Sequence, residues 1–159
     1  MPKILLADDS ESLRAALKDV LSQQQGWTIV GEATNGRSAV SLSIELKPDL
    51  IILDFLMPLM NGIAAACEIL RAVPGIPIVL YTMHMSTQLE REAKKVGITK
   101  VVSKTERFDA FIEGLNEVLV KKEAPIGPLG LCATDIAAPH DFAGCQSEPP
   151  KKPDDIPPS

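Results

Sequence analysis

The sequence predicts an α/β protein with a doubly wound parallel sheet of five strands and helices on both faces. Residues 50–53 are four consecutive large apolar residues, which is typical of a strand buried on both sides. Strand-like and helix-like segments alternate along residues 1–121, as expected when right-handed crossovers join parallel strands. Polar residues follow these strands, at the edge where open α/β sheets place their ligand sites.

Length and composition limit the classes of protein to consider. With 159 residues and 45% apolar content, the chain fits one α/β domain of about 120 residues plus an extension. The formal net charge of −5 gives no basic footprint for nucleic acid or an anionic membrane. No run of about 18 apolar residues could span a bilayer, and a signal-peptide pattern is missing at the N-terminus. Three cysteines without framework spacing suit a reducing compartment, so we expect a cytoplasmic protein.

The first two strand–helix units follow from short apolar runs and the helical spacing after them. Residues 3–7 form a strand, and Ser10 is a suitable N-cap for the helix that follows. Residues 27–33 form a second strand, after which Asn35 and Gly36 open a second helix. The expected apolar faces contain Leu13, Leu17, Val20 and Leu21 in the first helix and Ala39, Val40, Leu42 and Leu46 in the second.

The third unit surrounds the most apolar strand. Residues 49–54 form this strand, and Pro58 stops the chain from continuing in the sheet. Asn61 can cap a helix that begins at Gly62. Cys67 shares a face of this helix with apolar neighbours, so we expect a small core residue there and not a reactive thiol.

The last two units complete the alternation. Residues 78–82 form a fourth buried strand, Gly97 ends the helix after it, and residues 100–103 form a short fifth strand. The expected apolar positions of the last three helices are Ile63, Ala66 and Leu70, then Leu89, Ala93 and Val96, then Phe108, Phe111, Ile112, Leu115 and Leu119.

Five polar residues far apart in sequence meet at one edge if the sheet is parallel: Asp8, Asp9, Asp54, Thr82 and Lys104. Taken alone, each acid fits an ordinary solvated loop residue as well as it fits a functional one. Together, three carboxylates need positive charge, which Mg²⁺ supplies with few protein ligands and Lys104 can supplement. A metal-bound carboxylate beside a lysine and a hydroxyl is equipped to accept a phosphoryl group.

Residues 2–121 resemble the receiver domains of two-component response regulators. The acidic pair after the first strand, Asp54, Thr82 and Lys104 fall in the order and approximate spacing of that family. The Met-Pro-x-Met-Asn-Gly element of residues 57–62 is the most specific part of the resemblance. The family implies a flavodoxin-like fold, as in CheY, with the strand order 2-1-3-4-5.

The resemblance also implies roles for the site residues. Asp54 would be the phosphoryl acceptor and a Mg²⁺ ligand, Asp9 a direct ligand, and Asp8 a ligand acting more through water. The backbone carbonyl of Leu56 would complete the metal ligands of the protein. Thr82 and Lys104 would support transfer of the phosphoryl group. The resemblance further implies a protein that is not an enzyme, beyond accepting the phosphoryl group and slowly dephosphorylating itself.

Three positions depart from the family pattern. Val101 stands where many receivers carry an aromatic residue that turns inward on activation. Thr105 replaces the common proline after Lys104, so no cis X-Pro bond can form there. Leu56 occupies a position whose side chain tunes hydrolysis of the aspartyl phosphate in the family. Residues 81–84 look most like receivers that precede a helix-turn-helix output domain.

Residues 122–159 differ in composition from the rest of the chain. They are rich in proline and have no apolar period long enough to build a core, so we expect a disordered tail without an output domain. Cys132, His140 and Cys145 are one ligand short of a closed tetrahedral metal site. The short apolar clusters 126–131 and 136–138 could dock on a partner or on the receiver itself.

The sequence therefore predicts a stand-alone receiver that takes its phosphoryl group from a histidine kinase or phosphotransfer protein. Phosphorylation would change binding of a downstream protein target by the surface of the fourth helix, fifth strand and fifth helix. We expect no direct DNA binding, no membrane association, and a monomer or weak dimer. A degenerate receiver that only docks partners is the main alternative. A metal-dependent hydrolase lacks a second nucleophile or base, and a nucleotide-binding domain lacks a Gly-rich loop.

Overall fold

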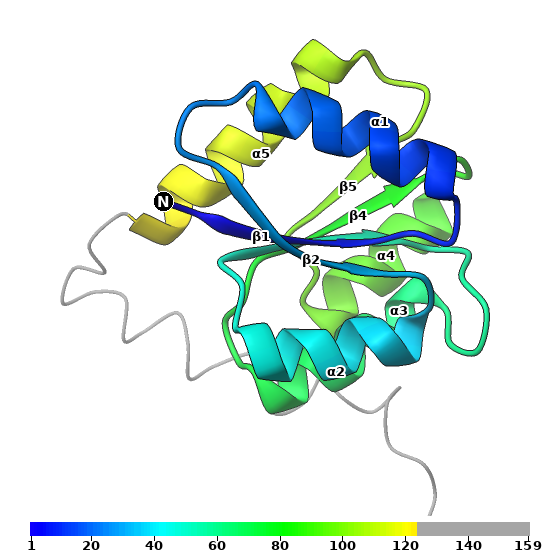
Figure 1. Cartoon of the computed structure of the whole chain (residues 1–159). Coiled ribbons are helices and arrows are strands. Elements are labelled where there is room, and N and C mark those ends of the chain that lie inside the picture. The colour runs from blue at the N-terminus through cyan, green and yellow to red at the C-terminus, as the bar shows by residue number, and fades with distance from the viewer. Residues whose placement is uncertain (124–159) are drawn as a thin grey trace, which may run out of the picture.

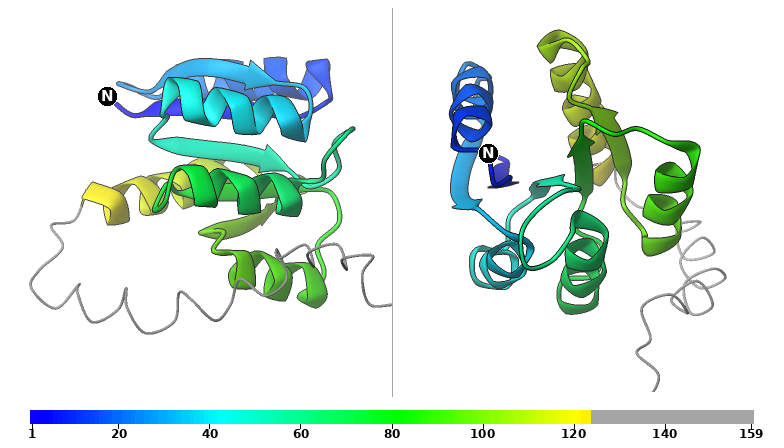
Figure 2. Two further views of the ribbon diagram at one scale, coloured as in Figure 1. Left: turned by 90° about the horizontal axis from the view of Figure 1, so that it is seen from below. Right: turned by 90° about the vertical axis from the view of Figure 1, so that its right-hand side faces the viewer.

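The computed structural model describes residues 1–123 of the chain, and these form one five-stranded parallel sheet between two layers of helices. The strand order is β2-β1-β3-β4-β5, and all four neighbouring pairs are parallel. Helices α1 and α5 cover one face, while α2, α3 and α4 cover the other (Figure 1), as two further directions also show (Figure 2). The predicted fold class and strand order are confirmed.

The elements begin and end close to the predicted positions. β4 and β5 match the prediction to the residue, and β2 begins one residue later than predicted, at Thr28. None of the helices in residues 1–123 is both long and apolar enough to cross a bilayer. The strands are β1 (Lys3–Ala7), β2 (Thr28–Ala33), β3 (Leu50–Asp54), β4 (Ile78–Thr82) and β5 (Lys100–Ser103). The helices are α1 (Glu11–Ser22), α2 (Gly36–Leu46), α3 (Gly62–Ala72), α4 (Thr87–Val96) and α5 (Phe108–Glu123).

Side-chain caps fix where four of the helices begin. Ser10, Asn35, Asn61 and Ser86 each accept a hydrogen bond from the backbone N–H three residues further on. Each cap satisfies a helix N–H that has no partner inside the helix. The cap at Asn61 starts α3 directly after the loop that follows β3, and so limits the length of the loop beside Asp54.

The hydrophobic core has two halves, one on each face of the sheet. Every residue of β3 and β4 is buried, which explains why both strands lack polar alternation. Ile51 and Leu53 face α2, α3 and α4, whereas Ile52 faces α1 and α5. Cys67 is buried, as predicted for a core position of α3. The apolar strands thus hold the middle of the sheet rigid up to the edge where Asp54 lies.

One expectation about the last helix is wrong. Phe108 was expected on the buried face of α5 but is 41% exposed, because the helix begins there and its face first meets the core one turn later, at Phe111. The helix itself ends at Glu123, and the domain boundary at residue 121 stays a prediction. Lys122 near its end pairs with Asp49 at 3.0 Å, and a cation there suits the helix dipole. The rest of the predicted tail, including Cys132, His140 and Cys145, lies outside the described residues.

We expect Gly62→Ala to destabilise the fold by about 2 kcal/mol, because its new methyl group would overlap the carbonyl oxygen of Asp54 and lie 2.9 Å from Leu80. Gly114→Ala makes the same chemical change inside α5, where the methyl group meets only the flexible end of Lys100. That control should gain roughly 0.5–1 kcal/mol from helix propensity. Urea unfolding followed by circular dichroism measures both. A Gly62→Ala protein as stable as the parent would contradict this packing.

Candidate functional site

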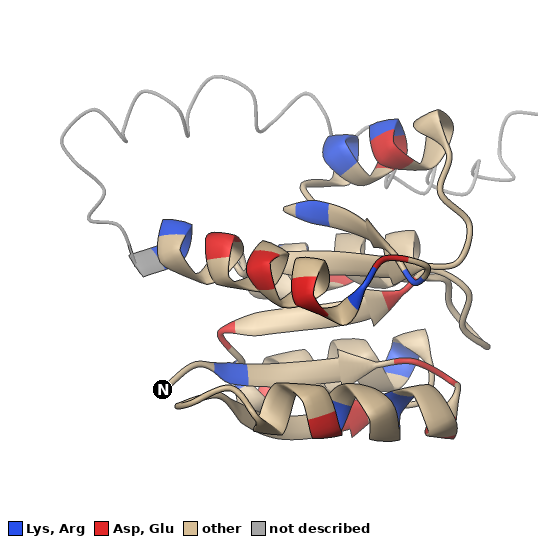
Figure 3. Ribbon diagram, turned by 90° about the horizontal axis from the view of Figure 1, so that it is seen from above, with Lys and Arg blue, Asp and Glu red and all other residues tan. Residues whose placement is uncertain are grey.

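The carboxyl ends of the central strands bring charged and polar side chains together. Asp8 and Asp9 follow β1, Asp54 ends β3, Thr82 ends β4 and Lys104 follows β5. Acidic and basic segments both lie at the edge toward which the strand arrows point (Figure 3). In an open parallel sheet this is the edge that carries ligand sites.

The three acids form one cluster. Asp8, Asp9 and Asp54 each offer a carboxylate oxygen, and these atoms lie within 4.8 Å of one another. Asp8 and Asp54 are buried, whereas Asp9 is exposed. Carboxylate oxygens are the ligands that hard divalent cations prefer, and an exposed member leaves space for the waters that Mg²⁺ keeps. The cluster could therefore hold a metal ion.

Lys104 is the positively charged side chain that pairs with the acidic cluster. Its Nζ lies 2.6 Å from Oδ2 of Asp8 and 3.1 Å from Oδ2 of Asp54, and its side chain is only 9% exposed. Burial works against the charged amine, but the hydrogen bonds to both acids raise the pKa of Lys104 above its usual value. With Asp9, three carboxylates and one ammonium leave a formal charge of −2, which a divalent cation would neutralise.

Asp54 is held in an unusual environment for a carboxylate. Burial raises the pKa of its carboxyl above the usual range, although Lys104 and the backbone N–H of Leu56 both favour the charged form. The side chain of Leu56 points away from the core and is 53% exposed. The role of its backbone carbonyl as a metal ligand stays a prediction.

Thr82 lies one residue beyond the β4 residue paired with Asp54, and it is buried. Its hydroxyl oxygen accepts a hydrogen bond from the backbone N–H of His84 at 3.2 Å, so the hydroxyl hydrogen can point elsewhere. Within residues 1–123 this hydroxyl has no hydrogen bond to any of the three acids. The structure thus brings Asp8 and Asp54 into contact with Lys104, and the carbonyl oxygen of Thr82 accepts a hydrogen bond from the backbone N–H of Lys104 at 2.8 Å.

Two residues near the site were missed by the sequence analysis. The ring centroid of Tyr81 lies 5.8 Å from Nζ of Lys104 and 4.6 Å from the ring centroid of Phe111. The Lys104 amine therefore lies over the face of a Tyr81 ring that is itself packed against Phe111. Arg14 of α1 donates a hydrogen bond to the carbonyl oxygen of Asp8 at 2.7 Å. The position of Tyr81 directly before Thr82 was the available signal for the first, and the position of Arg14 one helical turn after Ser10 for the second.

A family model and individual relatives all match this chain to the same protein family. The model of the response regulator receiver domain family matches residues 4–116. The chain is 37% identical to the chemotaxis protein CheY of Thermotoga maritima over 116 residues, which are 73% of this chain and 96% of that protein. It is 36% identical over 103 residues to the response regulator protein VraR of Staphylococcus epidermidis, which covers 65% of this chain but 49% of that protein. The chain thus spans about half the length of VraR.

Solved structures with similar folds belong to the same group. The response regulator domain of Thermotoga maritima CheB superposes with a TM-score of 0.69 at 30% identity, covering 76% of this chain and 95% of that one. Vibrio cholerae chemotaxis protein CheY4 gives a TM-score of 0.68 at 28% identity, covering 74% and 98%. The chain therefore belongs to the response regulator receiver family, whose members accept a phosphoryl group in two-component signalling.

Proposed function

We propose that this chain accepts a phosphoryl group on Asp54 from a histidine kinase or phosphotransfer protein and signals by phosphorylation-dependent protein binding. The contact that supports this most strongly joins Oδ2 of Asp54 to Nζ of Lys104 at 3.1 Å, within the acidic cluster. Both oxygens of Asp8 are already engaged, one by Lys104 at 2.6 Å and one by the backbone N–H of Ser10 at 2.8 Å. Asp9 has no contact with Lys104 among the described residues. Lys104 lies closer to Asp8 than to Asp54, so Asp8 is the more closely held of the two, and we take Asp54 as the nucleophile.

The transfer step moves one group between two carriers. An oxygen of Asp54 forms a bond to phosphorus as the bond from phosphorus to the donor imidazole nitrogen breaks, and the imidazole leaves with the electron pair. Lys104 is placed to pair with an oxygen of the phosphoryl group, and the Thr82 hydroxyl can turn to donate a hydrogen bond to another. Both contacts would stabilise the aspartyl phosphate once it has formed.

Mg²⁺ is the metal we propose for the acidic cluster, because the donors are hard oxygens and the formal charge of the site is negative. Asp8, Asp9, Asp54 and the backbone carbonyl of Leu56 would hold it. When bound, the ion supplies positive charge that offsets the charge of the phosphoryl oxygens.

Acetyl phosphate tests the proposed function without knowledge of the kinase. Incubation of the full chain with acetyl phosphate and Mg²⁺ should add one phosphoryl group, detected by intact-mass analysis. Chelation of the metal by EDTA should remove that product. Lack of any uptake with Mg²⁺ present would favour the degenerate receiver that only docks partners.

The wider organisation is also a proposal. We infer a cytoplasmic receiver, monomeric or weakly dimeric, in which residues 122–159 carry no output domain and no DNA-binding element. The composition of those residues supports the lack of an output domain, and the net charge of −5 supports the lack of a DNA-binding element. For the partner surface we propose α4, β5 and α5, because α4 exposes charges of both signs that a protein partner could pair with. These exposed residues are Glu90, Arg91, Glu92, Lys94 and Lys95.

We expect the phosphoryl group to be long-lived, because Leu56 at the edge of the site is exposed and cannot orient an attacking water. Leu56→Asn should speed loss of the phosphoryl group by roughly tenfold, since an amide can hold that water. Leu59→Asn is a matched control on the same loop, where the side chain is 76% exposed, and should leave the rate unchanged. Intact-mass analysis over time after removal of acetyl phosphate gives both rates. Unchanged or slower decay in Leu56→Asn would contradict this role.

A further inference from the structure

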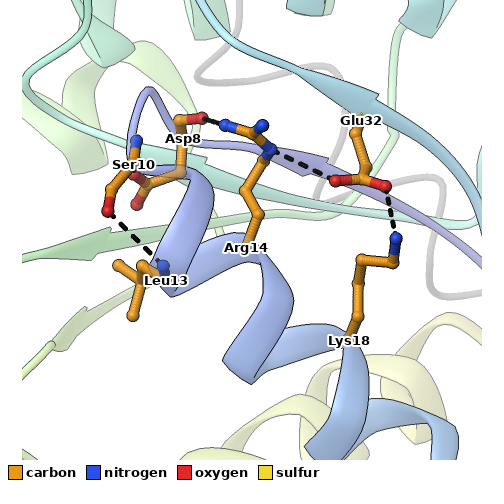
Figure 4. Close-up of polar contacts among 6 residues, drawn as sticks. All are labelled: Asp8, Ser10, Leu13, Arg14, Lys18 and Glu32. Carbon is orange, nitrogen blue, oxygen red and sulfur yellow. Dashed lines mark hydrogen bonds and ion pairs between the residues drawn. The ribbon is translucent and has the colours of Figure 1, made fainter.

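Arg14 ties α1 to the acidic loop through the backbone of that loop. Its NH1 group donates a hydrogen bond to the carbonyl oxygen of Asp8 at 2.7 Å, and its Nε lies 3.1 Å from Oε2 of Glu32 on β2 (Figure 4). We propose that Arg14 is a positioning residue: it holds the peptide between Asp8 and Asp9 so that the Asp9 carboxylate points toward a divalent cation bound by the cluster. The inference rests on the proposed metal site.

The Asp9 carboxylate needs such a restraint because no hydrogen bond or ion pair within the described part of the chain orients it. The neighbouring Asp8 carboxylate is held by Lys104 and by the backbone N–H of Ser10. Among residues 1–123, no hydrogen bond or ion pair reaches the exposed side chain of Asp9. Its direction therefore depends on the backbone, and the carbonyl that Arg14 binds belongs to the peptide that joins Asp8 to Asp9. Rotation of that peptide would swing the Asp9 carboxylate relative to its two neighbours.

The guanidinium is itself held in place from the side away from the loop. Oε1 of Glu32 accepts a hydrogen bond from Lys18 at 2.7 Å, and Oε2 accepts one from Arg14. Two residues of α1, Arg14 and Lys18, thus bind the same carboxylate on β2. The hydrogen bond from Lys18, with that from Arg14, lowers the pKa of Glu32 below its usual value, so this acid stays charged at neutral pH. The planar guanidinium fork can bond Glu32 and the Asp8 carbonyl together, which a lysine amine at the same position cannot do with equal geometry.

Electrostatics and positioning predict opposite results when Arg14 is replaced. If Arg14 acted only through its charge, removing a cation near the acids would reduce repulsion and strengthen binding of a divalent cation. If it acts by holding the peptide, the same change weakens binding although the site becomes more negative. The sign of the change in affinity therefore separates the two roles.

Calorimetric titration of the full chain with MgCl₂ alone measures this affinity without any phosphoryl transfer. Arg14→Met and Arg14→Lys should each bind Mg²⁺ about tenfold more weakly than the parent, the loss typical of removing a group that orients a metal ligand. Lys18→Met is the matched control, because it removes the other cation paired with Glu32 and leaves the Asp8 carbonyl contact intact. Its affinity should stay within about twofold of the parent, since exposed charges are screened by salt.

Each outcome of the titration decides one point. Failure of the parent protein to bind Mg²⁺ overturns the proposed metal site itself. Binding by the parent together with equal or tighter binding by Arg14→Met overturns only the positioning role. Arg14→Lys keeps the charge and decides the matter if Arg14→Met fails to fold by circular dichroism: affinity equal to the parent overturns the proposal. A loss in Lys18→Met as large as that in the Arg14 variants also overturns it.

Discussion

Replacing Asp54 with asparagine is expected to abolish phosphoryl uptake from acetyl phosphate while leaving the protein folded. The amide is almost the same size as the carboxylate, but it is a poor nucleophile. Asp8 is not expected to take over, because Lys104 holds its carboxylate more closely, at 2.6 Å against 3.1 Å for Asp54. Asp9 cannot do so either, because among the described residues it has no contact with Lys104 to stabilise the product.

Asp49→Asn is the matched control for that experiment. Asp49 precedes β3 at the opposite edge of the sheet, where it pairs with Lys122 at 3.0 Å and is partly exposed. Uptake by this variant should equal that of the parent protein, measured as the phosphorylated fraction in intact-mass spectra. Labelling of Asp54→Asn at the level of the parent would show that another residue is the acceptor.

Replacing Lys104 with methionine is expected to slow phosphoryl uptake by on the order of a hundredfold or more, because it removes a preorganised cation from the transferred group. It should also destabilise the metal-free protein by about 3 kcal/mol, since breaking a buried pair leaves carboxylates without their counter-charge. Asp8 and Asp54 are both buried and both bonded to this one amine. Saturating Mg²⁺ should recover much of that loss, because a ligand that binds only the folded state stabilises it.

Lys100→Met gives the control for that substitution. Lys100 pairs with Glu117 at 3.1 Å, but both side chains are exposed to solvent. An exposed pair contributes little, so stability should change by less than about 1 kcal/mol and phosphoryl uptake should not change. Urea unfolding with and without Mg²⁺ compares the two variants. A Lys104→Met protein that is as stable as the parent without Mg²⁺ would contradict the proposed balance of charges.

Much of the fold could be predicted because it depends on local sequence patterns. The uninterrupted apolar residues of β3 and β4 require burial on both faces, and a parallel sheet covered by helices supplies it. Asn61 marks the start of α3 because its side chain can accept from the N–H of Ala64. Parallel topology then places Asp8, Asp54 and Lys104 at one edge, and their contacts follow from that placement.

Other features could not be predicted because they depend on how elements meet in space. Helical spacing puts Phe108 on the same face as Phe111 but does not show that the core begins only at the later residue. The contact between Arg14 and the Asp8 carbonyl depends on the direction of a long side chain across a loop, and no sequence period encodes that direction. The support that Tyr81 gives to Lys104 likewise depends on the pairing of β4 with β3 and β5.

Direct chemical mapping of the phosphoryl group tests the proposed acceptor most directly. The full chain is incubated with acetyl phosphate and Mg²⁺ and then treated with sodium borohydride, which reduces an acyl phosphate to an alcohol and so converts a phosphorylated aspartate to homoserine. Peptide mass spectrometry then locates the converted residue. We predict homoserine at position 54 and aspartate at positions 8 and 9. Homoserine at position 8 or 9, with aspartate retained at position 54, would contradict the assignment of Asp54 as the phosphoryl acceptor.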